Sequence, residues 1–365
     1  MKLLKLKPCD NTFFRDGKVF KMGYNNIIQS KNIPYPSVFS GAVFTAFLAN
    51  NEGLKKKFMK NPSVKEKRKI LKIGQVYLYN ERTRDIYIPA PKDLFKDEDG
   101  EIYFGKFDDL AEGMTSLPYK KALMSPNIDG IERISKEFIN IKNIFREYKN
   151  KSYLGMDLVH EDEIFKKNYK VGIGTDYDKR IVKEDLLYRV EQTEFLSNDW
   201  SFIVEYDINI KLIKEKKIGN IEELKKGYLK LGGENKICKY EECDKWVNDY
   251  INEFRKNAED NYKINSSIIK LIFTSPVYFK GENDLNKIGV IGISSDKPIY
   301  IGGFDIKEKA AKQMYKGYEA GTVFLIMENK FETIKNRLET SIGDLINEGF
   351  GKYIILHLIK MPVKK

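Results

Sequence analysis

Residues 186–210 read LLYRVEQTEFLSNDWSFIVEYDINI and contain two long strand patterns. The first runs over 186–195. The second runs over 200–210, where large apolar side chains occupy every second position: Phe202, Val204, Tyr206, Ile208 and Ile210. A period of two is typical of a strand with one buried face. The stretch Ser197-Asn198-Asp199 is rich in turn-forming residues and is expected to connect the two strands.

Further helices and strands are expected on both sides of this stretch. The apolar run 38–49 predicts a largely buried helix, with Ser37 as its N-cap. Further helices are expected at 221–231, 241–260 and 331–347, and strands at 3–6, 76–79, 86–88, 170–174, 268–273, 288–293, 322–327 and 353–359. Residues 100–160 show weak periodicity and are expected to be irregular, with one or two short helices. Because most strands are joined by turns, the pattern favours an α+β fold over a doubly wound parallel sheet. Two antiparallel sheets with helices on one face, as in the ferredoxin-like β-α-β-β-α-β unit, fit it best.

The length of 365 residues favours two domains. We expect the boundary between about 150 and 220 and place it after residue 190. This division gives an N-terminal ferredoxin-like domain with insertions over 1–190 and a C-terminal ferredoxin-like domain over 191–365.

The formal net charge of +11 suits an anionic partner, either a nucleic acid or a membrane surface. It also fits a Lys-rich protein without such a partner. Much of the charge lies in residues 54–72, which form either a solvated face or a phosphate-contacting one. No apolar run reaches the roughly 20 residues that span a bilayer, and the N-terminus does not have the pattern of a signal peptide. The three cysteines, Cys9, Cys238 and Cys243, have no metal-site or disulfide spacing, which favours a reducing cytoplasm.

Six short motifs, in order along the chain, resemble the RAMP superfamily of CRISPR proteins, and in particular the Cmr-module subunit that binds the 5′ end of the guide RNA. They are KPCD with FFRDG at 7–17, PYPSVFSGA at 34–42, VGIGTD with LYR at 171–189, LGGE at 231–234, IGGFD with EAGTVF at 301–324, and GFG at 349–351. The sequence departs from the family pattern at Phe44, where a basic residue is common, and at Phe304, where Trp is common. Residues 54–160 resemble nothing that we can place.

The resemblance implies two ferredoxin-like, RRM-related domains in a non-catalytic subunit of a type III-B CRISPR ribonucleoprotein. Such a subunit would bind the 5′ handle of the guide RNA in the cytoplasm. Its partners would be the guide RNA, the large polymerase-like subunit and the backbone RAMP subunit. RNA cleavage would belong to the backbone subunits, and no cofactor is implied.

The candidate RNA contacts lie in the glycine-rich loops and at basic residues beside them. Glycine lets a phosphate approach main-chain N–H groups, although the same glycines also permit tight turns. The candidates are Arg15, Lys18, Ser37, Ser40, Gly172, Gly174, Gly302, Gly303, Lys312, Lys316, Gly349, Gly351 and Lys352. Phe13, Phe14 and Phe20 could stack on bases, but we expect at least two of them in the core.

Two other functions are considered. A metal-independent endoribonuclease that processes CRISPR transcripts would need a histidine as acid or base. Of the two histidines, His357 lies in an apolar strand and His160 stands beside three carboxylates, so we expect neither catalysis nor a metal site. A scaffold subunit that binds only protein would carry its charge incidentally.

Overall fold

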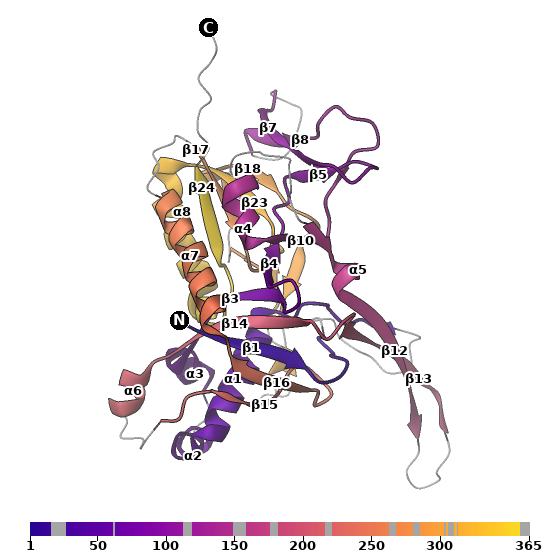
Figure 1. Ribbon diagram of the computed structural model, residues 1–365, viewed down its shortest axis with the longest axis vertical. Helices are drawn as coiled ribbons and strands as arrows, with labels where there is room; N and C mark the ends of the chain where they lie inside the picture. Colours follow the sequence, from indigo (N-terminus) through magenta and orange to yellow (C-terminus); the bar gives the residue numbers. More distant parts are fainter. Residues whose placement is uncertain are drawn as a thin grey trace.

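The computed structural model describes residues 1–15, 27–60, 63–111, 119–148, 158–175, 182–215, 221–262, 268–279, 285–302, 304–305, 310–311 and 313–357. The fold is mixed α+β with several antiparallel sheets, which confirms the expected class in its coarse form (Figure 1). Among the described residues, no helix combines the length and apolar character needed to cross a bilayer.

The larger sheet has eight strands in the order β11-β10-β4-β3-β14-β1-β16-β15, and each neighbouring pair is antiparallel. The strands are β1 (Lys2–Pro8), β3 (Leu71–Asn80), β4 (Asp85–Pro89), β10 (Glu137–Asn140), β11 (Leu158–His160), β14 (Trp200–Ile208), β15 (Lys226–Lys230) and β16 (Ile237–Glu242). The second strand pattern of the sequence thus becomes β14, which lies in the middle of this sheet.

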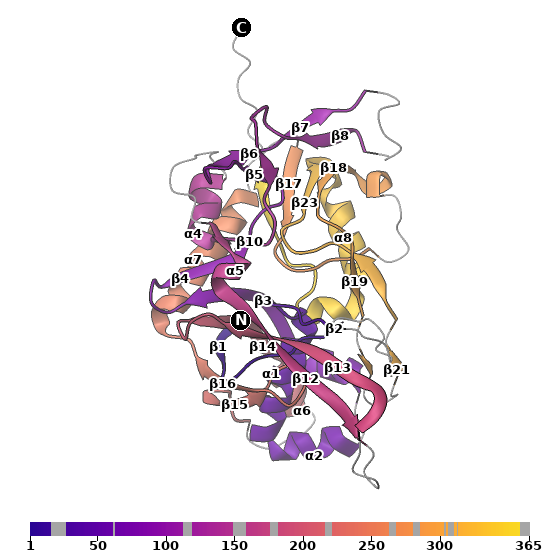
Figure 2. The ribbon, with the colours of Figure 1, turned by 90° about the vertical axis from the view of Figure 1, so that its right-hand side faces the viewer.

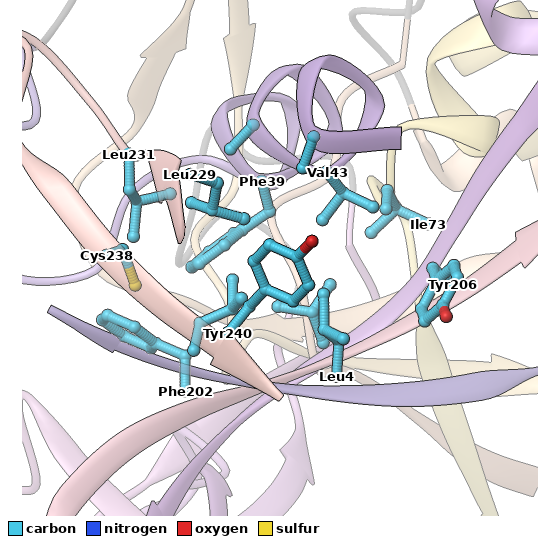
Figure 3. Close-up of a cluster of buried hydrophobic side chains, with 14 of the residues drawn as sticks. Leu4, Phe39, Val43, Ile73, Phe202, Tyr206, Leu229, Leu231, Cys238 and Tyr240 are labelled. Carbon is cyan, nitrogen blue, oxygen red and sulfur yellow. The ribbon is translucent and has the colours of Figure 1, made fainter. Parts of the chain in front are cut away.

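Helices cover both faces of β14. On one face, α1 (Pro36–Asn50) packs in a cluster with Phe202 of β14, and the ring of Phe39 contacts that of Phe202 (Figure 3). On the other face, α7 (Lys245–Tyr262) packs in a cluster with Ile203 of β14. The alternating pattern predicted the first buried face, but α7 buries the second face as well.

The smaller sheet has four antiparallel strands in the order β18-β23-β17-β24. They are β17 (Ile268–Phe273), β18 (Val290–Ser294), β23 (Val323–Met327) and β24 (Tyr353–His357). Apolar side chains of this sheet form one buried cluster with those of α8 (Phe331–Ile342). The cluster around α7 contains Ile272 and Leu356 of this sheet together with Ile203 of the larger one, so α7 joins the two sheets through one core.

A long hairpin projects from the body (Figures 1 and 2). It pairs β12 (Phe165–Thr175) with β13 (Val182–Phe195), and β2 (Ile27–Ile28) runs parallel to β13. The expected turn over 197–199 therefore connects β13 to β14, but the two strands separate there into different sheets.

The remaining strands form short ribbons: β5 (Leu94–Lys96) with β6 (Ile102–Phe104) and β9 (Glu132–Arg133), β7 (Lys106–Asp109) with β8 (Lys121–Met124), β19 (Ile299–Ile301) with β22 (Tyr315–Gly317), and β20 (Phe304–Asp305) with β21 (Ala310–Ala311). The remaining helical segments are α2 (Glu52–Lys60), α3 (Val64–Ile70), α4 (Ile141–Asn143), η1 (Ile144–Tyr148), α5 (Glu161–Ile164), α6 (Ile210–Glu215), η2 (Leu285–Ile288), η3 (Glu328–Lys330) and η4 (Gly343–Asn347).

Two expectations about local structure were wrong. Residues 221–231 are not a helix, since 226–230 form β15 with Leu229 facing the core and Tyr228 facing solvent. Pairing with β16 overrides the local helix preference there. The described part of 100–160 contains several short strands, which the expectation of irregular chain missed, although the expected short helical segments are present as α4 and η1. The division after residue 190 stays a prediction, and the larger sheet takes strands from both sides of it.

The burial of β14 leads to a stability prediction. Phe202 is 1% exposed and its ring contacts those of Phe39 and Phe195, at 5.3 and 5.1 Å between centroids. Phe202→Ala should lower the free energy of unfolding by about 3–5 kcal/mol, because it leaves a cavity. The control Tyr228→Ala, at a residue 70% exposed, should change it by less than about 0.5 kcal/mol. Urea denaturation followed by circular dichroism measures both, and equal effects would contradict the placement of β14 in the core.

Candidate nucleic-acid interface

Two cavities border the junction between the sheets, and they differ in charge. The first, a cleft of about 500 Å³, is lined by residues 29–36, by parts of β3 and β10, by the base of the projecting hairpin and by residues 274–276. Its lysines, Lys31, Lys92, Lys136 and Lys167, are matched by four glutamates, Glu137, Glu161, Glu191 and Glu319. Several are paired inside the fold, including Lys167 with Glu191 at 2.9 Å and Lys136 with Glu161. This cleft offers no surplus of positive charge to a polyanion.

The second cavity, which we call the glycine-loop groove, has a volume of about 360 Å³. Its lining comes from the start of α1, from α3, from the β19–β22 ribbon and from the segment that joins α8 to β24: Ser37, Arg68, Tyr278, Ile301, Gly302, Gln313, Tyr315, Thr340, Ser341, Ile342, Gly343, Leu345, Glu348 and Phe350. Ser37, Gly302 and Phe350 come from three different sequence motifs and meet at this one surface, although the first and the last are more than 250 residues apart in the chain.

Aromatic rings stand in and beside this groove. Tyr278 and Tyr315 stack with centroids 4.5 Å apart and an interplanar angle of 12°. Tyr300 of β19 is 59% exposed and lies opposite Lys316 of β22, which is also exposed. A flat ring next to an ammonium group is the combination that binds a base and its phosphate.

The glycines of the last motif have structural reasons for being glycine. Gly349 and Gly351 have φ values of +96° and +65°, which other residues rarely adopt. A Cβ on Gly349 would lie 2.9 Å from the Cβ of Pro36, and one on Gly351 would lie 2.3 Å from Cδ1 of Ile342. These glycines therefore let the loop pack against α1 and α8, whether or not RNA is bound. Gly302 lines the groove, and a Cβ there would lie 2.8 Å from Cγ of Met314.

The serines at the start of α1 differ in exposure. The helix begins at Pro36 with Tyr35 as its N-cap, so the expectation that Ser37 is the N-cap was wrong. Proline is well suited to the first helical position, where no N–H is needed. Ser37 is half-buried and lines the groove, whereas Ser40 is 0% exposed and its hydroxyl has no hydrogen-bond partner among the described residues.

The basic residues around the groove are held by Glu348. This carboxylate is buried and lies 3.1 Å from Nε of Arg68 and 3.3 Å from Nζ of Lys67. Lys352 follows the glycine loop, and its ammonium group donates to the carbonyl of Ile346 at 3.1 Å. Burial, and then the charge of Lys72, lower the pKa of Lys352 to about 8.

The other candidate contacts do not line the groove. Gly172 and Gly174 lie in β12 on the projecting hairpin, and the exposed Arg15 follows β1. Lys18, Gly303 and Lys312 lie outside the described residues.

The phenylalanines and histidines have structural places. Phe13 and Phe14 are buried, which confirms the expectation that two of the three belong to the core, and Phe20 lies outside the described residues. Nδ1 of His160 accepts a hydrogen bond from the backbone N–H of Asp162 and caps α5. His357 belongs to β24.

Sequence reasoning missed Arg68, Tyr278 and Tyr300. Arg68 was noted only as part of the basic stretch 54–72, and no local pattern distinguishes its side chain from the neighbouring lysines. The two tyrosines belong to no recognisable motif. The folded chain brings Tyr278 into the groove and Tyr300 onto the ribbon beside it.

Comparisons with known proteins agree with the fold. Among solved structures, one chain of a type III-B Cmr-β cryo-EM structure bound to cognate target RNA and AMPPnP matches with a TM-score of 0.56 at 16% identity. A chain of another, bound to cognate target RNA, matches with a TM-score of 0.56 at 17% identity. In both, 96% of each chain is covered. At such identity the likeness shows the fold alone, and no curated protein matches the sequence significantly.

The family comparison is more specific. The sequence profile described as CRISPR-associated protein (Cas_Cmr3) matches residues 4–358, which is nearly the whole chain. The chain therefore belongs to the Cmr3 family of CRISPR-associated proteins.

Proposed function

We propose that this protein is a non-catalytic subunit of a type III-B CRISPR ribonucleoprotein and that it binds the 5′ handle of the guide RNA in the glycine-loop groove. The observation that carries the proposal is the meeting of three family motifs at this groove. Ser37 comes from PYPSVFSGA, Gly302 from IGGFD and Phe350 from GFG. A common binding surface explains why motifs so far apart in the sequence share one place in the fold.

The chemistry of the groove supports single-stranded RNA as its ligand. Tyr278 and Tyr315 line the groove with aromatic surface. On the β19–β22 ribbon beside it, the exposed Tyr300 offers a further ring and Lys316 opposite offers a positive charge for a phosphate. The carboxylate of Glu348 is already neutralised by Lys67 and Arg68, so it does not repel a phosphate strongly.

The strand orders support two ferredoxin-like units as part of the proposal. In the larger sheet β1 lies between β14 and β16, and β14 lies next to β3. In the smaller sheet β17 lies between β23 and β24, and β23 lies next to β18. Both follow the order in which the first strand of a β-α-β-β-α-β unit sits between its third and fourth strands.

The assembly that we propose includes the large polymerase-like subunit and the backbone RAMP subunit as partners, in the cytoplasm. The Cmr-β structures with a similar fold were determined with cognate target RNA bound, which is consistent with a ribonucleoprotein.

The proposal predicts that the purified chain retains a labelled repeat RNA without cutting it. His160→Ala should leave the RNA equally intact, because that imidazole caps a helix and stands among carboxylates. Gel shift and denaturing electrophoresis of the same samples measure retention and cleavage. Metal-independent cleavage that is lost in His160→Ala would support the endoribonuclease instead, and neither retention nor cleavage would support the protein-binding scaffold.

The ribbon that forms one wall of the groove is tested at two exposed residues next to the lining. The double variant Tyr300→Ala/Lys316→Ala should weaken handle binding at least tenfold, about 1.4 kcal/mol, because stacking alone contributes about 1–3 kcal/mol per base. Fluorescence anisotropy with a labelled handle RNA measures the affinity. Tyr228→Ala, an exposed tyrosine on β15, is the matched control and should bind as the wild type does. Unchanged affinity in the double variant would place the handle elsewhere.

A further inference from the structure

A third cavity, separate from the two described above, lies next to the glycine-loop groove and is strongly basic. It forms where β3 begins and β14 ends, between α3, α6 and η4, and has a volume of about 660 Å³. Its charged lining residues are Arg68, Lys69, Lys72 and Lys211, with Asp207 as the one carboxylate among the described lining. We call it the α3–α6 groove. Figure 1 shows α2, α3 and α6 gathered at the same end of the molecule.

The fold leaves part of this charge without a counterion. Arg68 contacts Glu348, and Lys69 lies 3.4 Å from Glu66. Lys72 and Lys211 are exposed, and within the ranges that the structure describes neither ammonium group has a hydrogen-bond or ion-pair partner. The cleft of about 500 Å³, by contrast, has as many glutamates as lysines in its lining. The α3–α6 groove is therefore a place where the net charge of the chain is concentrated and open to a ligand.

A neighbouring residue responds to the same concentration of charge. The pKa of Lys352 is lowered first by burial and then by the charge of Lys72. The charge of Glu205 acts in the opposite direction and raises the pKa of Lys352. This carboxylate accepts hydrogen bonds from the hydroxyl of Tyr77 at 2.6 Å and from Nε of Arg255 at 3.2 Å. An anion in the groove would lie near Lys72 and would weaken the effect of its charge on Lys352.

The two grooves are adjacent and share Arg68 as a lining residue. The segment formed by η4 and Glu348 is a wall of both grooves. Leu345 and Glu348 line the glycine-loop groove, and Asn347 lines the α3–α6 groove. A strand that leaves the glycine-loop groove past Arg68 would next meet Lys72 and Lys211. Ile208 and Ile210 also line the α3–α6 groove and offer apolar contact to riboses.

We propose that the α3–α6 groove binds the phosphodiester backbone of single-stranded RNA that continues beyond the guide handle. The proposal rests on handle binding in the glycine-loop groove for the direction of the strand. It gives the basic stretch 54–72 a binding role through Arg68, Lys69 and Lys72, in place of a purely solvated face.

The test uses the full-length chain and three labelled RNAs: the handle alone, a uridine tract alone, and the handle extended by that tract. Labelled poly-glutamate is the fourth probe. Lys72→Gln/Lys211→Gln removes two exposed charges. Lys226→Gln/Lys245→Gln, at exposed lysines on β15 and at the start of α7, removes the same charge elsewhere and is the control. Affinity is measured by anisotropy over a series of salt concentrations.

The Lys72/Lys211 variant should bind the extended RNA at least about tenfold more weakly, with a salt slope flatter by up to about 1.4, from about 0.7 per phosphate. Its affinity for the handle alone, and the affinity of the control for the handle or the extended RNA, should change less than twofold. Equal losses for the handle and the extended RNA, equal losses in the control, or wild-type binding of the extended RNA would overturn the proposal.

The same experiment separates this proposal from the proposed function. If the wild type does not bind the handle but binds the uridine tract through Lys72 and Lys211, handle binding fails and the α3–α6 groove remains an RNA site. If poly-glutamate binds through these lysines and RNA does not, the ligand is an acidic protein segment and the proposal is overturned.

Discussion

The close packing of Gly349 against Pro36 and β3 is the contact on which the proposed binding surfaces depend. A Cβ at this position would lie 2.9 Å from Cβ of Pro36, 3.0 Å from Cγ2 of Ile73 and 3.1 Å from the carbonyl of Gly74. The loop therefore fits only without a side chain, and its positive φ independently favours glycine. Beside it, the buried Glu348 pairs with Lys67 and Arg68, and its backbone forms a parallel bridge to Ile73. This junction fixes η4 between the two sheets, and η4 is the wall that the two grooves share.

Electrostatics then distinguish the surfaces that the junction creates. The cleft of about 500 Å³ has four lysines and four glutamates in its lining, and Lys136 pairs with Glu161 and Lys167 with Glu191. The α3–α6 groove keeps Lys72 and Lys211 without partners among the residues that the structure describes, while Arg68 connects it to the glycine-loop groove. The net charge of +11 alone did not say where an anion would bind, and the fold distributes that charge unevenly. The stacked rings of Tyr278 and Tyr315 line the neighbouring glycine-loop groove, which shares Arg68 with the α3–α6 groove.

Much of the larger sheet could be predicted from the sequence, because β1 and β14 follow a period of two and α1 is a continuous apolar run. The burial of Ile203 beneath α7 could not, since the alternating pattern indicates one buried face and says nothing of a second layer. The error at 221–231 has a similar cause, because β15 exists through its pairing with β16. At the site, the motifs pointed to Ser37, Gly302 and the last glycine loop. Arg68 and Tyr278 could not be found, because only the tertiary fold brings them there.

Guide RNA bound in the glycine-loop groove would contact the peptides that surround this groove. The most direct measurement is photo-crosslinking of the full-length chain to a handle RNA that carries 4-thiouridine, followed by mass spectrometry of the linked peptides. The account predicts crosslinks in peptides that contain 298–302, 313–317 and 345–350, which surround the groove. Crosslinks confined to the projecting hairpin over 165–195, or to α7, with none in these three segments, would contradict it.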